Sequence, residues 1–229
     1  MKPEISITIP IYNEEGGIKK TVNNLVKVFG EKKANYELVL VNHGSWDNTE
    51  KIIKEMGEKN KKLTIINLAK NLGYGGGILY GMEHSKGEFI GWTCADEEIS
   101  AEDVWKIYAA IKNKKYDVVK ALRTKRKDGL LRIFTTFVFN NLISFRFGFN
   151  LKDINGYPVF FKKDMLEKIK PTEKSHLFNL DLMKNMNKNN MKILEIPVIH
   201  RKRQEGTTFM KLPRIFEMAF DFFKYSLRF

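Results

Sequence analysis

The sequence predicts an α/β protein with a mainly parallel central sheet flanked by helices, and its first hundred residues carry this prediction. Four short apolar runs, typical of buried strands, cover residues 5–11, 37–41, 63–68 and 88–94. Between them, residues 15–29, 47–57 and 77–85 carry apolar side chains at helical spacing. Strands that alternate with helices of this length are joined by right-handed crossovers, which makes the sheet mainly parallel.

Each of the four predicted strands is followed by a loop rich in polar residues and glycine. In chain order the loop sequences are PIYNEE, NHGSWDNT, NLGYGGG and CADEEIS. Ligands of parallel sheets bind beyond the carboxyl ends of the strands, so these loops form the candidate site. Asn13, Asp47 and Ser100 are of the residue types that cap helix N-termini. The glycines of the third loop permit close approach to a phosphate or to a neighbouring element.

The pattern changes beyond a further predicted strand at Val118 and Val119. A basic cluster (RTKRKD) precedes an aromatic-rich helical stretch, and a turn (DINGYP) leads into a short strand. The remaining predicted elements are a helix, a strand, a second basic loop (HRKRQEGTT) and an amphipathic C-terminal helix. In chain order the predicted helices and strands of this half are residues 133–149, 159–161, 180–186, 192–198 and 215–229.

Charge is distributed unevenly along the 229 residues. Residues 1–110 hold 14 lysines, no arginine and 16 acidic residues, whereas residues 111–229 hold 26 lysines and arginines and 11 acidic residues. The net charge of +13 therefore lies in the second half, which predicts an anionic partner such as phosphate groups, an anionic membrane surface or nucleic acid. The alternative is that scattered lysines are simply solvated.

Three further features predict a cytoplasmic protein. Cys94 is the single cysteine, which excludes an intramolecular disulfide and fits a reducing compartment. The N-terminal apolar run is interrupted by Pro10 and followed by Glu14 and Glu15, so it lacks the apolar core of a secretory signal. No stretch reaches the roughly 18 uncharged apolar residues that crossing a bilayer requires.

The motifs IPIYNEE, VNHGSWDNT, NLGYGGG, the acidic loop around Asp96, DINGYP and RKRQEGTT stand in the order and spacing of a known family. The chain resembles the family 2 glycosyltransferases of the GT-A fold, in particular the branch of polyprenyl-phosphate hexose transferases similar to dolichol-phosphate mannose synthase. The resemblance runs from about residue 4 to residue 212. It implies a GT-A domain at 1–212, with residues 213–229 as a C-terminal amphipathic helix.

The resemblance implies an inverting transfer of a hexose from a nucleotide-diphosphate sugar to a polyprenyl phosphate or a surface-glycan acceptor. Asp96 would be catalytic and would hold Mg²⁺ or Mn²⁺, with Glu98 as the second metal ligand, because hard cations prefer oxygen. The implied donor-binding residues are Pro10, Tyr12, Asn13, Glu14, Asn42, Gly44, Ser45, Asn71, Gly73 and Ala95.

Arginines of the two basic segments are expected to grip phosphate. Arg203, with Gly206 and Thr208, matches the family pattern Arg-x-x-Gly-x-Ser and is implied to be catalytic. The implied acceptor- or phosphate-binding residues are Arg123, Arg126, Arg132 and Thr208. A phosphate acceptor needs no side-chain base, whereas a sugar hydroxyl would need Asp153 or Asp96 to remove its proton. Asp153 is also of a residue type that is common in ordinary turns, without a role in catalysis.

The chain departs from the family pattern at two places. Cys94 replaces the first aspartate of the Asp-x-Asp motif, and a neutral thiol is a poor ligand for a hard cation. Metal binding is therefore weaker, rearranged toward Glu97 or Glu98, or absent. Asn42 and His43 replace two adjacent aspartates, the first of which contacts the nucleotide in the family, and this leaves the identity of the nucleotide open.

Four alternatives follow from these observations. The departures at Cys94 and at Asn42-His43 permit a catalytically degenerate GT-A fold that binds a nucleotide or a partner. Nucleic-acid binding through the basic half is disfavoured, since no helix-turn-helix or RNA-binding signature is present. The aromatic stretches at 133–149 and 215–229 are by default core or an oligomer interface, so a homo-oligomer is a candidate state. Their basic flanks equally fit peripheral docking at the cytoplasmic face of a membrane.

Overall fold

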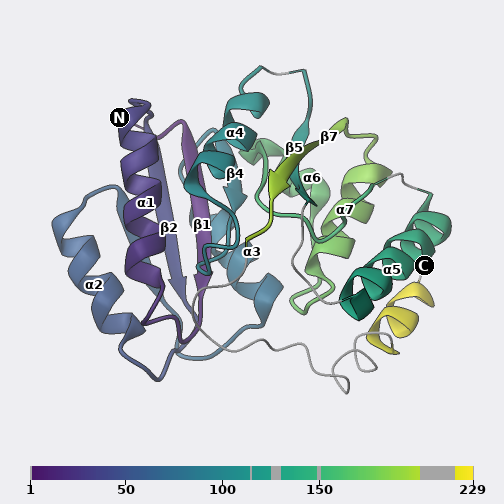
Figure 1. Ribbon diagram of the computed structural model, residues 1–229, viewed down its shortest axis with the longest axis horizontal. Helices are drawn as coiled ribbons and strands as arrows, with labels where there is room; N and C mark the ends of the chain where they lie inside the picture. Colours follow the sequence, from purple (N-terminus) through teal and green to yellow (C-terminus); the bar gives the residue numbers. More distant parts are fainter. Residues whose placement is uncertain (1, 114, 125–129, 149–150, 202–219, 229) are drawn as a thin grey trace.

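The computed structural model describes all residues except 1, 114, 125–129, 149–150, 202–219 and 229. Its centre is a seven-stranded sheet in the order β3-β2-β1-β4-β6-β5-β7 (Figure 1). The strands are β1 (Ile5–Ile11), β2 (Tyr36–Asn42), β3 (Leu63–Asn67), β4 (Phe89–Trp92), β5 (Val118–Thr124), β6 (Val159–Lys162) and β7 (Ile193–Ile199). Only β6 runs antiparallel to its neighbours among these strands. The predicted mainly parallel α/β sheet is confirmed.

Helices follow most strands, as the periodicity predicts. They are α1 (Ile18–Glu31), α2 (Thr49–Lys59), α3 (Tyr74–His84), α4 (Ala101–Ile111), α5 (Leu130–Phe147), α6 (Leu166–Ile169) and α7 (Phe178–Lys188), with a 3₁₀ turn at Lys163–Met165. Residues 220–226 are helical and residues 227 and 228 form a turn, whereas residues 215–219 and 229 of the predicted C-terminal helix lie outside the described residues. No helix in the described part of the chain is long and apolar enough to cross a bilayer.

Both faces of the sheet are covered, which explains why the strands read as continuous apolar runs. Helices α1 and α4 pack against each other on one face, and α2 packs beside α1. Helix α3 lies against β1 and β2 on the other face, where Gly81 sits so close to Thr8 that an added Cβ would lie 2.3 Å from the Thr8 methyl. The glycines of α3 thus let this helix approach the sheet closely.

The N-termini of the helices confirm one predicted cap and contradict another. Ser100 caps α4 as predicted, because its hydroxyl accepts a hydrogen bond from the Asp103 amide at 3.2 Å. Asp47, two residues before α2 begins at Thr49, accepts from the Thr49 amide at 3.0 Å, while Asn48 takes the cap position without a side-chain bond. The prediction that Asn13 caps α1 is wrong, since that helix begins at Ile18 without a side-chain cap. Asn13 instead has a left-handed backbone, with φ of 53°.

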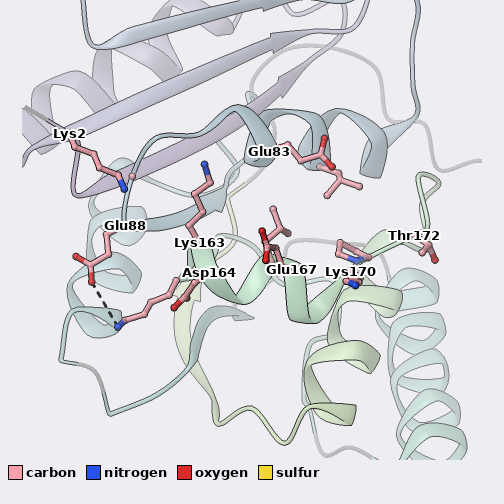
Figure 2. Close-up of a pocket in the computed structure, with 13 residues that line it drawn as sticks. Lys2, Glu83, Glu88, Lys163, Asp164, Glu167, Lys170 and Thr172 are labelled. Carbon is pink, nitrogen blue, oxygen red and sulfur yellow. Dashed lines mark ion pairs between the residues drawn. The ribbon is translucent and has the colours of Figure 1, made fainter.

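A cavity of about 980 Å³ lies at the amino ends of the parallel strands, away from the predicted site. It lies between the segments before β1 and β4, the last turns of α3, and α6 (Figure 2). Acidic and basic side chains alternate around it, among them Lys2, Glu83, Glu88 and Lys163. This mixture of charges carries no net preference for an anionic ligand.

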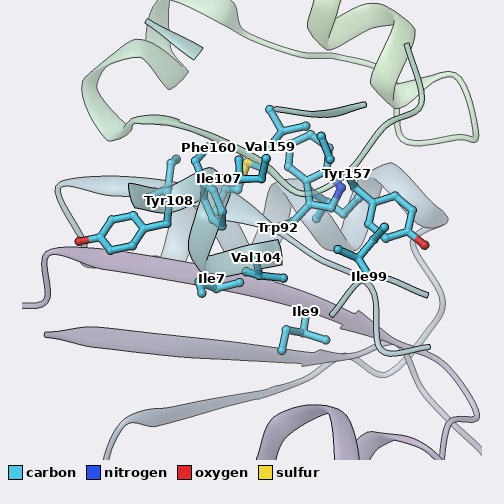
Figure 3. Close-up of a cluster of buried hydrophobic side chains, with 14 of the residues drawn as sticks. Ile7, Ile9, Trp92, Ile99, Val104, Ile107, Tyr108, Tyr157, Val159 and Phe160 are labelled. Carbon is cyan, nitrogen blue, oxygen red and sulfur yellow. The ribbon is translucent and has the colours of Figure 1, made fainter. Parts of the chain in front are cut away.

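The core between α4 and the sheet ends directly beneath the predicted site. Tyr108 and Phe160 are fully buried there, together with Ile7 from the first strand (Figure 3). Trp92 is equally buried on the opposite face of the sheet, against Tyr74 and Phe178. Tyr157 lies at the border of this cluster, and its hydroxyl points out of it. The aromatic core therefore gives the carboxyl-end loops a rigid floor, since interiors packed in this way do not deform easily.

Candidate active site

The sheet order places the carboxyl ends of β3, β2, β1 and β4 side by side, so the four polar loops converge as predicted. The first two loops are joined by hydrogen bonds. The Asn13 amide donates to Ser45 Oγ at 3.0 Å, and the Trp46 amide donates to Asn13 Oδ1 at the same distance. The Glu14 amide donates to Thr49 Oγ1 at 2.9 Å. Asparagine is one of the few residues that tolerate the left-handed conformation needed at position 13.

Asn42 is fully buried at the end of β2 and shapes the second loop. Its Oδ1 accepts from the Ser45 amide at 3.1 Å and from Ser45 Oγ at 2.6 Å. Its Nδ2 donates to Asn67 Oδ1 at 3.2 Å, at the end of β3. Gly44 supplies the positive φ of 70° that this tight loop requires. Asn42 thus connects three segments of the predicted donor side.

His43 fills a space between β2 and α3. Its side chain is buried, and an added Cβ at Gly77 would lie 1.5 Å from its Nε2, so the imidazole fits only because residue 77 is glycine. Burial lowers the pKa of His43, and its hydrogen bond with Asn71 raises that pKa by less. The ring is therefore a neutral packing group at pH 7.

The acidic loop after β4 is held against α1. Thr21 Oγ1 donates to the Ala95 carbonyl at 2.7 Å. Glu97 has a left-handed backbone, with φ of 54°, and its carboxylate accepts from Asn24 Nδ2 at 2.5 Å and pairs with Lys20 Nζ at 2.7 Å. Glu97 therefore points toward α1, away from its neighbours at 96 and 98.

Asp96 and Glu98 gather around the hydroxyl of Tyr157. This hydroxyl donates to Glu98 Oε2 at 2.8 Å and lies 3.5 Å from Asp96 Oδ2. His200 Nε2 lies 3.0 Å from the same Glu98 oxygen, and the Arg201 amide donates to the Glu98 carbonyl at 2.8 Å. The end of β7 is thus bound to the acidic loop.

Sequence reasoning missed Tyr157 and His200 as site residues. Tyr157 lies in the DINGYP motif, which was interpreted as a turn, and His200 opens a loop interpreted through its arginines. A signal was present in both cases, because a tyrosine hydroxyl and an imidazole are frequent partners of carboxylates. Only the fold shows which carboxylate each one meets.

Cys94 does not supply a ligand for a hard cation. Burial raises the pKa of its thiol well above the usual value, and the charges of Asp96 and Glu98 raise it further. The sulfur is therefore a neutral thiol. Within the described ranges, no group of three histidine, cysteine or acidic side chains is arranged to hold a metal ion. The oxygen donors of Asp96 and Glu98 fit Mg²⁺ or Mn²⁺ in type, whereas Cys94 does not.

Arg123 and Asp153 form a buried two-bond ion pair. Arg123 Nε donates to Asp153 Oδ2 at 2.7 Å, Nη2 donates to Oδ1 at 2.8 Å, and the side chains are 8% and 5% exposed. Burial alone would raise the pKa of Asp153, but the hydrogen bonds and charge of Arg123 outweigh it and lower the pKa to about 2. Asp153 is thus ionised and a weak proton acceptor.

A second buried pair supports the first. Lys120 is fully buried, and its ammonium donates to the Asp153 carbonyl and lies 3.5 Å from Glu195 Oε1. Glu195 accepts from the amides of Lys152 and Asp153 at 2.8 and 3.0 Å. These contacts fix the backbone that carries the Asp153 carboxylate, and Asp153 in turn fixes the guanidinium of Arg123.

The remaining predicted site residues lie at the strand ends, in α5 or outside the described part of the chain. Pro10 is partly buried near the end of β1, and Tyr12, which directly follows that strand, is 39% exposed. The Gly73 amide donates to Asn71 Oδ1 at 2.7 Å at the start of α3. Arg132 lies in α5, but its side chain is outside what the structure describes. Arg126, Arg203 and Thr208 lie outside the described residues.

Solved structures with a similar fold identify the fold of this chain. Glucosyl-3-phosphoglycerate synthase from Mycobacterium tuberculosis in complex with uridine-diphosphate matches with a TM-score of 0.75, 14% sequence identity and coverage of 99% of this chain and 79% of that one. The same synthase with Mn²⁺, uridine-diphosphate and glucosyl-3-phosphoglycerate matches with a TM-score of 0.73 and 15% identity over 95% and 76% of the two chains. The fold is that of the GT-A glycosyltransferases.

The chain belongs to glycosyl transferase family 2, whose model matches residues 6–170. It is 25% identical over 218 residues to undecaprenyl-phosphate 4-deoxy-4-formamido-L-arabinose transferase from Edwardsiella ictaluri, across 95% of this chain and 66% of that protein. It is also 25% identical over 220 residues to dodecaprenyl-phosphate galacturonate synthase from Rhizobium johnstonii, across 95% and 65%. The chain spans just under two thirds of the length of these relatives.

Proposed function

We propose that this chain transfers a sugar from a nucleotide-diphosphate donor to a polyprenyl phosphate. The observation that carries the proposal is the grouping of Asp96, Glu98, Tyr157 and His200 at the carboxyl end of β4. The buried ion pair of Arg123, on β5, with Asp153, in the segment before β6, accompanies this group. The names of the relatives, which are transferases and synthases of polyprenyl-phosphate sugars, support the class of acceptor.

The donor nucleotide lies, in this proposal, against the loops that follow β1, β2 and β3. Asn13, Asn42 and Ser45 present amide and hydroxyl groups in a fixed arrangement, which suits recognition of a base and ribose. The other proposed lining residues are Pro10, Tyr12, Glu14, Gly44, Asn71, Gly73 and Ala95. Since Asn42 is already bonded to Ser45 and Asn67, it acts chiefly by shaping this surface.

Asp96 and Glu98 are the residues that would hold a divalent cation. Such an ion supplies neutralisation of the leaving diphosphate, and the solved synthase with Mn²⁺ and uridine-diphosphate supports its use in this fold. Tyr157 and His200 hold the Glu98 carboxylate in place from behind. Because Cys94 stands as a neutral thiol where the family has an aspartate, only the carboxylates of Asp96 and Glu98 would hold the ion. We therefore expect weak metal affinity.

The chemistry favours a phosphate acceptor over a sugar hydroxyl. A phosphate oxygen is already anionic, so it can attack the anomeric carbon directly while the bond to the diphosphate breaks. Attack from the face opposite the diphosphate inverts that carbon. A hydroxyl acceptor would need a base, and the Asp153 carboxylate has a pKa of about 2 and both oxygens on Arg123. Asp153 therefore positions Arg123, and the guanidinium faces the acceptor phosphate. Arg126, Arg132, Arg203 and Thr208 are proposed to add phosphate contacts.

Asp96→Asn tests the proposal directly. It should lower sugar transfer roughly 100-fold or more, because a metal-binding carboxylate contributes several kcal/mol to stabilising the leaving group. The measurement is release of nucleoside diphosphate from candidate nucleotide sugars with a polyprenyl phosphate and Mn²⁺, alongside the melting temperature. Glu58→Gln, an exposed carboxylate on α2, is the matched control and should leave both quantities unchanged.

Two outcomes would contradict this assignment. Undiminished transfer by Asp96→Asn would place the catalytic centre elsewhere. A rise of the wild-type melting temperature with a nucleotide sugar, but no product with any acceptor, would instead favour the degenerate, binding-only alternative, since a ligand that prefers the folded state raises the melting temperature whether or not it reacts.

A further inference from the structure

The glycine loop, residues 71–77, leads from β3 into the first turn of α3 and is closed by a segment that lies far away in the chain. The Gly76 amide, which an α-helix leaves without an internal partner in its first turn, donates to the Lys174 carbonyl at 3.1 Å. An added Cβ at Gly73 would lie 2.6 Å from the same carbonyl oxygen, so the loop and the Lys174 backbone are in direct contact. The placement of Lys174 therefore sets the start of α3.

The segment that carries Lys174 is held by a buried carboxylate on α7. Asp181 is 1% exposed, and its Oδ2 accepts from the amides of Thr172 and Glu173 at 2.7 and 3.2 Å. Burial raises the pKa of Asp181, but the hydrogen bonds that it accepts and the charge of Lys184 outweigh this effect and lower the pKa, so the carboxylate is charged at pH 7. Two consecutive amides on one charged oxygen fix the backbone just before Lys174.

The other oxygen of Asp181 is bound from the C-terminal helix, residues 220–226. The Tyr225 hydroxyl donates to Asp181 Oδ1 at 2.6 Å, and Tyr225 is 2% exposed. A hydrogen bond to an ionised acceptor is about twice as strong as one between neutral groups. The helix lies with α5 at the end of the molecule opposite α2 (Figure 1), and Arg146 Nη2 on α5 donates to the Ser226 carbonyl at 3.0 Å. The orientation of Asp181 thus depends on a residue that belongs to neither α7 nor the glycine loop.

These contacts end at the donor side of the proposed site. The glycine loop carries two proposed donor-binding residues, and one shapes the loop for the other, since Asn71 Oδ1 accepts from the Gly73 amide at 2.7 Å. Gly73 also supplies a positive φ of 80°, which residues with a side chain adopt poorly. A binding loop that is already held in one conformation binds its ligand more tightly, because less ordering remains to be done on binding. The support of the glycine loop by residues 172–174 should therefore raise the affinity for the donor.

We propose that Asp181 and Tyr225 are positioning residues for the nucleotide-diphosphate donor, and that they act through the backbone of residues 172–174 on the glycine loop. The identity of the ligand rests on the proposed function, whereas the order of the contacts rests on the hydrogen bonds alone. Because these contacts lead to the donor side, loss of either side chain should weaken donor binding and leave kcat nearly unchanged.

Tyr225→Phe tests the proposal in the full chain, because it removes only the hydroxyl. Amide hydrogen exchange should become roughly fivefold faster in residues 71–77, and uridine-diphosphate with Mn²⁺ should bind roughly fivefold more weakly in calorimetry. In sugar transfer, the KM for the donor should rise by a similar factor while kcat stays within roughly twofold. Tyr36→Phe is the matched control, since it removes a tyrosine hydroxyl bond to the Val26 carbonyl on α1 and should alter none of these quantities.

Asp181→Asn should have a larger effect, because asparagine offers one acceptor oxygen to the Tyr225 hydroxyl and the two backbone amides. Combining it with Tyr225→Phe should weaken nucleotide binding no further, since the hydroxyl acts through Asp181. The coupling is reciprocal, so uridine-diphosphate should slow exchange in residues 220–226 of the wild type, and less so in Tyr225→Phe. If Asp181→Asn does not fold, Tyr225→Phe and this reciprocal measurement decide the question.

A lower melting temperature of Tyr225→Phe without faster exchange in the glycine loop or weaker nucleotide binding would overturn the proposal, because the hydroxyl would then serve stability alone. Additive effects of Asp181→Asn and Tyr225→Phe on binding would overturn the order of the contacts. A wild type that binds neither uridine-diphosphate nor guanosine-diphosphate would contradict the proposed function instead. The exchange rates in residues 71–77 would still show whether Tyr225 orders the loop, so the two failures are separable.

Discussion

The two sides of the candidate site are built with different chemistry. On the side of β1 and β2, the partly buried hydrogen bonds that join the loops are between neutral groups, as between Asn13 and Ser45, and the carboxylates of Glu15 and Asp47 add only exposed ones. On the side of β5 and β7, buried ion pairs join the segments, with Arg123 bound to Asp153 and Lys120 near Glu195. A neutral hydrogen bond contributes about 1 kcal/mol, whereas breaking a buried ion pair by removing one partner costs about 3–5 kcal/mol. We therefore expect the first side to tolerate substitution and the second to resist it.

The largest expected effect is the loss of one partner of the buried pair. Arg123→Met should destabilise the protein by about 3–5 kcal/mol, because it leaves the Asp153 carboxylate buried without a counter-charge. Adding Asp153→Asn to Arg123→Met should recover part of this loss, because the unpaired charge is removed. Urea unfolding at pH 7 measures both free energies. A cost below about 1 kcal/mol for Arg123→Met would remove the contrast between the two sides.

The pH dependence sharpens the same comparison. The pKa of Asp153 is about 2 in the folded protein and about 3.9 when unfolded, so its contribution to stability is fully present above about pH 4. As the pH falls from 4 through 2, that contribution disappears. The stability difference between wild type and Asp153→Asn should therefore be constant from pH 5 to 7 and shrink below pH 4. Unfolding curves at each pH measure this difference in the free energy of unfolding. A difference that stays the same below pH 4 would contradict the lowered pKa of Asp153.

An intermediate effect is expected at Glu97, whose left-handed backbone lies between Asp96 and Glu98. A β-branched residue adopts this conformation poorly, so Glu97→Val should cost about 1–2 kcal/mol and lower kcat/KM by roughly tenfold through displacement of Asp96. Glu97→Gly keeps the backbone conformation without strain and should retain activity within roughly threefold. It also removes the carboxylate that meets Lys20 and Asn24, a contact whose lysine is 55% exposed and which therefore contributes little. Equal losses in both variants would show that the carboxylate, rather than the backbone, matters.

The sequence predicts the first side of the site better than the second, for a physical reason. Strands β1 to β4 alternate with helices, so local periodicity and the order of the chain are enough to bring Asn13, Asn42 and Asp96 to one edge. Family motifs add the GT-A fold, which the comparisons confirm, and the expectation that the donor lies on this side.

The second side depends on pairings that no local pattern contains. Strand β6 runs antiparallel between β4 and β5, and this placement brings Tyr157 to the acidic loop. Asp153 is an acceptable base when only its own motif is considered, and the sequence does not show that Arg123, 30 residues earlier, holds both of its oxygens. Buried charge is expensive unless it is paired, so its partners are decided by the whole fold.

The smallest expected effect lies on the neutral side, at Ser45. Ser45→Ala removes the acceptor of the Asn13 amide and one donor to Asn42, and should cost about 1 kcal/mol with a several-fold rise in the KM for the donor. Thr49→Val is the matched variant, because it removes the acceptor of the Glu14 amide with almost no change of shape. Arg123→Met should cost the same free energy of unfolding in the wild-type, Ser45→Ala and Thr49→Val backgrounds. The reason is that the two sides share no hydrogen bond among those described. A coupling above about 0.5 kcal/mol between Ser45→Ala and Arg123→Met would show that the neutral loops and the buried charges act as one unit.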